Sequence, residues 1–145
     1  MIEEHLNGSG SRYAPYRSWN ENRIAGLLNK YGIPFIYEKP AAVIDNGQVR
    51  LWYPDYYLSY GFLIEYFGIQ GNPEYDRRTR HKLQVYQENQ MDVLALYQQD
   101  MGRSWDDHLL RRIDTMLEQR LTGYRSAIGR GYMAPPLPPP PQAYR

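Results

Sequence analysis

Residues 53–68 have the sequence YPDYYLSYGFLIEYFG, in which two runs of aromatic and aliphatic residues flank a short turn around Tyr60. Runs of this composition favour β-strands, and the Ser-Tyr-Gly triplet between them favours a tight turn. The pattern predicts a β-hairpin whose first strand ends at Leu58 and whose second strand spans Phe62 to Phe67. The neighbouring elements can be placed in order on either side of this hairpin.

Two acidic residues, Asp55 and Glu65, lie at mirrored positions in the predicted hairpin. If the turn is centred on Tyr60, they face each other with Cβ atoms about 4.5–5.5 Å apart, where like charges are unfavourable. Their aromatic and aliphatic surroundings make unpaired charge costly. Mg²⁺ is commonly held by one or two carboxylates with water and substrate phosphate, so the pair predicts a metal site. A register shifted by one residue would instead turn one acid towards solvent.

Pro54 precedes the first of these acids and cannot donate a hydrogen bond to a strand ladder. It marks either an edge strand or a bend, and a bend would re-aim the Asp55 carboxylate.

The elements on either side predict an α/β domain. Periodicity and turn signals predict helices over 18–31, 71–89 and 105–121, and strands over 33–37, 49–58, 62–67 and 91–97. The Asn46-Gly47 pair adds a strong hairpin signal. The first three strands form an antiparallel meander, and the helix before the fourth strand predicts a parallel pair with a right-handed crossover. The result is a mixed sheet with helices on both faces.

The bulk composition of this 145-residue chain allows one domain with an ordinary core. No run approaches the ~20 apolar residues that span a bilayer, and the first ten residues lack the pattern of a secretory signal. With no cysteine, disulfides and thiolate metal sites are excluded, and a cytoplasmic location is expected. The net charge of +1 means that any phosphate contacts must be local.

The two ends differ in composition from the middle. Residues 1–15 contain a Gly/Ser-rich stretch and predict a flexible lead-in, whereas residues 16–124 form the predicted folded domain. Residues 125–145 contain PPLPPPP at positions 135–141 and predict a flexible proline-rich tail. This tail is either a spacer or, through its PxxP match, a binding segment for a protein partner.

These motifs together resemble the PD-(D/E)xK nuclease superfamily. Pro54-Asp55 is similar to the PD element and Glu65 to the second acid, while Phe67 stands where most members carry lysine. One branch places that lysine on the following helix. This branch resembles very-short-patch-repair endonucleases and the nuclease domains attached to some superfamily-1 helicases.

The match to this branch extends over residues 18–100. Its IEYFG-like strand corresponds to residues 64–68, its lysine-bearing helix to residues 80–86, and its initial Ser-x-x-Glu to Ser18 and Glu21. Four motifs in the same order, on the predicted helix–strand–strand–helix pattern, are far more specific than Pro-Asp alone.

The resemblance implies a restriction-endonuclease-like αβββαβ core and an endonuclease that hydrolyses DNA in repair, recombination, restriction or a mobile element. RNA remains an alternative substrate, and cutting both strands of a duplex would suit a homodimer. The implied cofactor is Mg²⁺ or Mn²⁺, held by Asp55, Glu65 and the backbone carbonyl of Tyr66. Lys82 would activate water, and Glu21 would assist.

Each remaining candidate has a simpler interpretation. Lys82 could extend from a helix flank into solvent, and Glu21 could complete a capping box with Ser18. Phosphate contacts are expected from basic residues that could equally form a solvated surface: Arg77, Arg78, Arg80 and Lys39. Two functions compete with the nuclease: a degenerate nuclease fold that binds nucleic acid or protein without cutting, and an adaptor that recruits partners through its tail.

Overall fold

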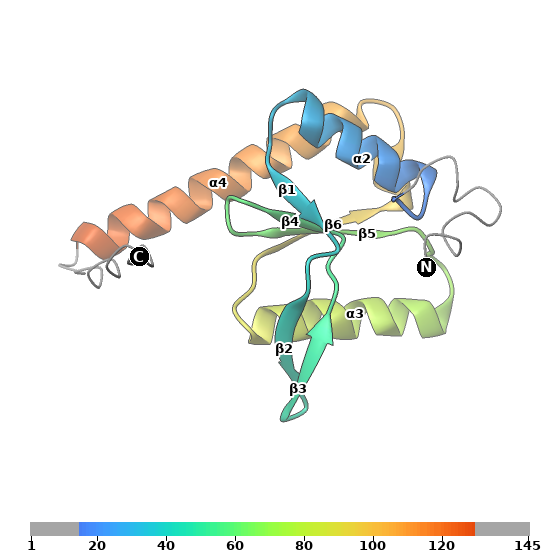
Figure 1. The fold of residues 1–145 in the computed structure, drawn as a ribbon, viewed down its shortest axis with the longest axis horizontal. Coiled ribbons are helices and arrows are strands. Elements are labelled where there is room, and N and C mark those ends of the chain that lie inside the picture. Colours follow the sequence, from blue (N-terminus) through green and yellow to red (C-terminus); the bar gives the residue numbers. More distant parts are fainter. Residues whose placement is uncertain (1–14, 130–145) are drawn as a thin grey trace, which may run out of the picture.

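The computed structural model describes residues 15–129 and shows a mixed β-sheet between helices (Figure 1). In chain order, the elements of this range are α2 (Trp19–Lys30), β1 (Phe35–Tyr37), β2 (Ala41–Asp45), β3 (Gln48–Trp52), β4 (Tyr56–Leu58), β5 (Leu63–Phe67), α3 (Pro73–Glu88), β6 (Val93–Tyr97), the 3-10 helix η2 (Gln98–Met101) and α4 (Trp105–Gly129). The predicted α/β class, with a mixed sheet, flanking helices and a C-terminal helix, is confirmed.

The main sheet of the described range has the strand order β1-β4-β5-β6. β4 pairs antiparallel with both β1 and β5, and β5 pairs parallel with β6 after α3 has crossed the sheet. The predicted antiparallel pairing of the first part of the sheet and the predicted parallel pair are both confirmed, although the β2–β3 hairpin interrupts the predicted meander between β1 and β4. α2 and α4 cover one face of this sheet and α3 covers the other (Figure 1).

The hydrophobic core has one part on each side of the sheet. On the side of α2 and α4, Ile24, Leu28 and Leu109 pack on buried residues of the strands such as Ile64. On the other side, Val85 and Tyr86 of α3 pack with Val43 and Leu63. Because both faces of β5 are buried, its sequence is an unbroken apolar run apart from one buried acid.

The strand predicted from Val49 to Leu58 is wrong, because this segment forms two strands. β3 ends at Trp52 and β4 begins at Tyr56, and the chain bends at Asp55 just after Pro54. The bend is therefore the correct alternative for Pro54. β3 pairs instead with β2, a strand absent from the prediction, in a separate hairpin beside α3 (Figure 1).

Turn residues explain the other boundaries. Asn46 and Gly47 have φ of 51° and 75°, as the predicted hairpin turn requires, and they join β2 to β3. Strand β1 begins at Phe35 rather than at the predicted Ile33, because the Ile33 N–H bonds to the Leu28 carbonyl and closes the end of α2. α4 passes the predicted end at Leu121 and continues to Gly129.

The predicted tail, residues 125–145, therefore begins with residues that belong to α4, and its proline run lies outside the described residues. The predicted lead-in, residues 1–15, also lies outside them except for its last residue. None of the helices in the range 15–129 has the length and apolar character needed to cross a membrane.

Candidate active site

The β4–β5 hairpin brings Asp55 and Glu65 to the same site. Tyr56 pairs with Ile64 and Tyr57 with Leu63, which is the register predicted for a turn centred on Tyr60. Asp55 lies one residue before β4, and its Oδ2 accepts a hydrogen bond from the Tyr66 N–H at 2.7 Å. The bend at Pro54 thus attaches the Asp55 carboxylate to the backbone of the strand that carries Glu65.

Both acids line an open pocket of about 390 Å³. It is surrounded by the start of α2, the residue before β4, residues 65–68 at the end of β5, and residues 75–82 of α3. Six of the predicted residues line this pocket: Glu21, Asp55, Glu65, Tyr66, Arg78 and Lys82. The four residues predicted to be catalytic are among these six.

Glu65 is 1% exposed, and both of its oxygens accept hydrogen bonds from α3. The Lys82 ammonium group lies 3.0 Å from Oε2, and the Tyr86 hydroxyl donates to Oε1 at 2.7 Å. Lys82 and Tyr86 are four residues apart, so they share one face of the helix. The ammonium group of Lys82 therefore points into the pocket rather than extending into solvent.

The charge conflict expected from the sequence is present at Asp55. Its pKa is raised from 3.8 to about 8, first by burial and then by the negative charge of Glu65. The hydrogen bond from Tyr66 and the charge of Lys82 oppose this rise, whereas Glu21 adds to it. Without a further cation, protonation of Asp55 is favoured over a second buried negative charge.

Glu21 is held at the α2 side of the pocket and is 7% exposed. Its N–H donates to Ser18 Oγ at 3.1 Å, which is the serine half of the predicted capping box. Its carboxylate accepts hydrogen bonds from the hydroxyls of Tyr37, at 2.9 Å, and Ser18, at 2.8 Å. The cap thus uses the backbone N–H of Glu21. The Glu21 carboxylate is bound to the hydroxyls of Ser18 and Tyr37.

Three tyrosines that the sequence analysis did not assign to the site hold these acids in place. Tyr37 and Tyr86 donate to the carboxylates of Glu21 and Glu65, and Tyr56 donates to the Glu21 carbonyl at 2.6 Å. Burial, followed by the nearby carboxylates, raises the pKa of all three hydroxyls, so they remain protonated donors. The spacing of Tyr86 four residues after Lys82 was the one sequence signal that could have revealed this role.

The predicted phosphate-binding residues are spread over several surfaces. Arg78 lines the pocket of the two acids and pairs with Glu74 at 2.8 Å. Arg77 lines a neighbouring groove and Arg80 a separate pocket. Lys39 does not line the pocket of the acids, and its ammonium group lies 4.3 Å from the centre of the Tyr57 ring. Of these four residues, only Arg78 adjoins Asp55 and Glu65.

The donor set at this pocket fits a hard divalent cation. Asp55 and Glu65 offer carboxylate oxygens. Burial and then the charge of Glu65 raise the pKa of Asp55, and a bound cation would offset both effects. Within residues 15–129, no three side chains of the His, Cys, Asp and Glu types form a metal-binding group. Two carboxylates would therefore have to be completed by backbone oxygen, water or substrate, as is usual for Mg²⁺.

Comparison with known proteins gives no match to this chain among family models, curated proteins or solved structures.

Proposed function

We propose that this chain is a PD-(D/E)xK-type nuclease that uses Mg²⁺ or Mn²⁺ to hydrolyse phosphodiester bonds in DNA. One observation carries the proposal: Asp55, Glu65 and Lys82 line a single pocket, with the Lys82 ammonium group 3.0 Å from the Glu65 carboxylate. Two carboxylates can hold a metal ion that activates water, and a lysine beside them can stabilise the negative charge that develops on a phosphate. The site would act inside the cell, in repair, recombination, restriction or a mobile element.

Asp55 and Glu65 would hold the metal ion, and the Tyr66 carbonyl would complete the set that the resemblance implies. A bound ion of this kind polarises a phosphoryl oxygen and lowers the pKa of its water. The chain's own residues position these groups. Tyr86 fixes the orientation of Glu65, and the Tyr66 N–H fixes that of Asp55.

Two cationic side chains supply the positive charge that a phosphate needs. Lys82 brings its ammonium group to the pocket, where it stabilises negative charge that develops on the scissile phosphate. Arg78 lines the same pocket and, being on the exposed side of α3, can hold a neighbouring phosphate. Glu21, already bound to two hydroxyl groups, would orient water on the α2 side.

The hydrogen bonds of Glu65 favour a second candidate function. Both of its oxygens already accept from Lys82 and Tyr86, so a metal ion must share an oxygen with one of these donors. A degenerate site could keep this arrangement as a structural ion pair, and the fold would then bind nucleic acid or a protein without cutting.

The experiment that separates the two is cleavage of supercoiled plasmid DNA with Mg²⁺, with Mn²⁺ and with chelator. We expect metal-dependent nicking or cutting, which Asp55→Asn, Glu65→Gln and Lys82→Ala each reduce by about a hundredfold or more. Glu88→Gln, an exposed position on the same helix as Lys82, is the matched control and should retain full activity. Cleavage that persists in chelator would refute the metal mechanism. DNA binding without cleavage under all conditions would select the binding module.

A further inference from the structure

A second pocket of about 670 Å³ lies between strand β3 and helix α3. The hairpin side contributes apolar and aromatic residues: Leu51, Trp52 and Tyr53. The helix side contributes basic residues: Arg77, Arg78, His81 and Lys82. We call this space the β3–α3 pocket. Its volume is in the range of pockets that hold small molecules or cofactors.

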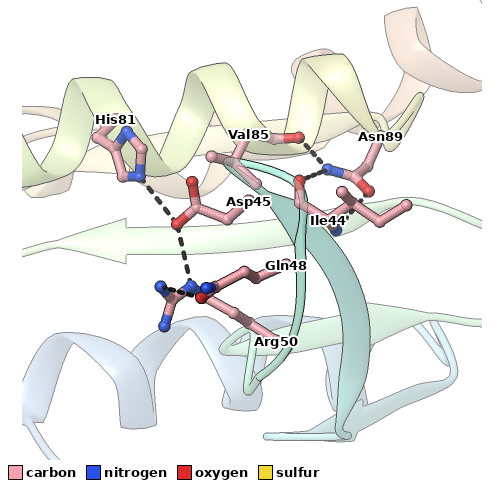
Figure 2. Close-up of polar contacts among 7 residues, drawn as sticks. All are labelled: Ile44, Asp45, Gln48, Arg50, His81, Val85 and Asn89. Carbon is pink, nitrogen blue, oxygen red and sulfur yellow. Dashed lines mark hydrogen bonds and ion pairs between the residues drawn. The ribbon is translucent and has the colours of Figure 1, made fainter.

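The walls of the β3–α3 pocket are held together by polar contacts (Figure 2). The Asp45 carboxylate lies 3.1 Å from His81 Nε2 and 3.5 Å from Arg50 Nε, which ties the end of β2 to α3. The Asn89 side chain accepts from the Ile44 N–H at 2.8 Å and donates to the Ile44 carbonyl at 2.9 Å. It thus binds the same backbone groups of Ile44 that a neighbouring strand would bind.

Packing also fixes the floor of the pocket. The Trp52 ring meets the buried ring of Tyr86 edge-on, with centroids 5.4 Å apart and planes at 90°. Tyr86 in turn binds Glu65. The hairpin is thus attached to the helix that carries Lys82, and the pocket is formed before any ligand arrives.

The chemistry of the two walls matches a nucleotide. Leu51 is 55% exposed and Tyr53 is 52% exposed, so large apolar surfaces lie open beside the basic side chains of α3. A planar base can stack on an aromatic ring irrespective of its identity, and the phosphates beside it are attracted by arginine and lysine.

The β3–α3 pocket adjoins the pocket of the two acids. Arg78 and Lys82 line both of them, so a base in one would lie next to a phosphate in the other. Bases inside a paired duplex are stacked and cannot enter a side pocket unless they leave the stack.

We propose that the β3–α3 pocket receives one unpaired base of the strand whose phosphate lies at Asp55 and Glu65. The preferred substrate is therefore nucleic acid that is unpaired at the position of cleavage, such as a bulge or a single strand. This inference rests on the proposed nuclease function and adds the substrate structure to it.

The test uses the full chain in chelator with three fluorescently labelled DNA duplexes of one sequence. The first is fully paired, the second carries one unpaired base, and the third carries an abasic residue at that same unpaired position. Fluorescence anisotropy should show that the duplex with the unpaired base binds about tenfold more tightly than the other two, as expected for one base–aromatic stack.

The variant Tyr53→Ala should remove this preference and leave the affinity for the fully paired duplex unchanged. The matched control is Tyr31→Ala, because Tyr31 is 53% exposed at the end of α2 and does not line the β3–α3 pocket. Thermal melting of both variants checks that they fold.

Equal binding of the three duplexes by the wild-type protein would overturn the inference. A preference that survives Tyr53→Ala, or a variant that weakens all three duplexes alike, would overturn it as well, because the base would then lie elsewhere. These readouts are independent of cleavage. Plasmid cutting without a preference for the unpaired base would support the nuclease function and refute the proposed base pocket. A preference for the unpaired base without metal-dependent cutting would support the base pocket and refute the nuclease function.

Discussion

Replacing Asp55 with asparagine tests whether the two acids form a charge conflict that only a cation resolves. The change removes one charge and keeps an oxygen that can accept the hydrogen bond from the Tyr66 N–H. In chelator at neutral pH, we therefore expect Asp55→Asn to be at least as stable as the wild-type protein, although inactive. Loss of a merely structural hydrogen-bonding aspartate would lower stability instead.

The pH dependence of this effect follows from the pKa of Asp55, which rises from 3.8 to about 8 on folding. Because the folded state holds this proton more tightly, the free energy of unfolding of the wild-type protein decreases as the pH rises through this range. The asparagine variant lacks this titration. The two proteins should therefore be similar near pH 4 and should differ most above about pH 8.

The pKa difference also limits the size of the effect. A difference of about four between the two pKa values corresponds to at most about 6 kcal/mol, and water that enters the open pocket screens the charges further. We expect a stability difference of about 1–2 kcal/mol at pH 9. For a domain of this size, this corresponds to a difference of roughly 4–8 °C in Tm.

Thermal melts at pH 5, 7 and 9 in chelator measure this difference. Further melts with Mg²⁺ or Mn²⁺ measure how much the metal stabilises each protein. A metal present at about a hundred times its Kd stabilises the wild-type protein by about 2.7 kcal/mol and should affect Asp55→Asn much less. Asp114→Asn, on the exposed side of α4, is the control and should follow the wild-type protein. If Asp55→Asn melts well below wild type at pH 9 in chelator, and metal shifts both alike, Asp55 is a structural residue and the reasoning fails.

Two further predictions concern Glu21 and the C-terminal residues. Glu21→Gln keeps the backbone bond to Ser18, so Tm should change little while plasmid cleavage decreases at least tenfold; unchanged cleavage would show that Glu21 serves only the helix end. Removal of residues 130–145 should leave both Tm and cleavage intact, because a proline run buries little apolar surface, and a large decrease in Tm would show that these residues pack on the domain.

The sequence predicted the β4–β5 hairpin correctly because the evidence for it was local. A turn around Tyr60 sets the register, and the register places Asp55 beside Glu65. The same local reasoning failed between Val49 and Leu58, where composition favours one strand. Pro54 breaks that run, and the first half finds its partner in β2 instead of in the main sheet.

The hydrogen-bond donors of the site were harder to predict, because they come from separate elements that meet only in the folded chain. Tyr37 reaches Glu21 from β1, and Tyr86 reaches Glu65 from α3. Tyrosine is as common in hydrophobic cores as in hydrogen-bonding roles. The residue type alone therefore does not tell a tyrosine that packs in the core from one that donates to a carboxylate. The β3–α3 pocket was also beyond prediction, since it forms where contacts of Asp45, Asn89 and Trp52 attach the hairpin to α3.

The position of the lysine connects the two pockets. Phe67 stands where the resemblance places lysine in most members. Its ring stacks on the ring of Tyr97, with the two centroids 5.6 Å apart. The Lys82 ammonium group lies 6.0 Å from the centre of the Phe67 ring, so a cation from α3 reaches the space above this strand position. Supplying the ammonium group from a helix has a consequence that a strand lysine would not have. The same helix presents Arg77 and His81 to the β3–α3 pocket, so the position of α3 sets the geometry of both pockets at once.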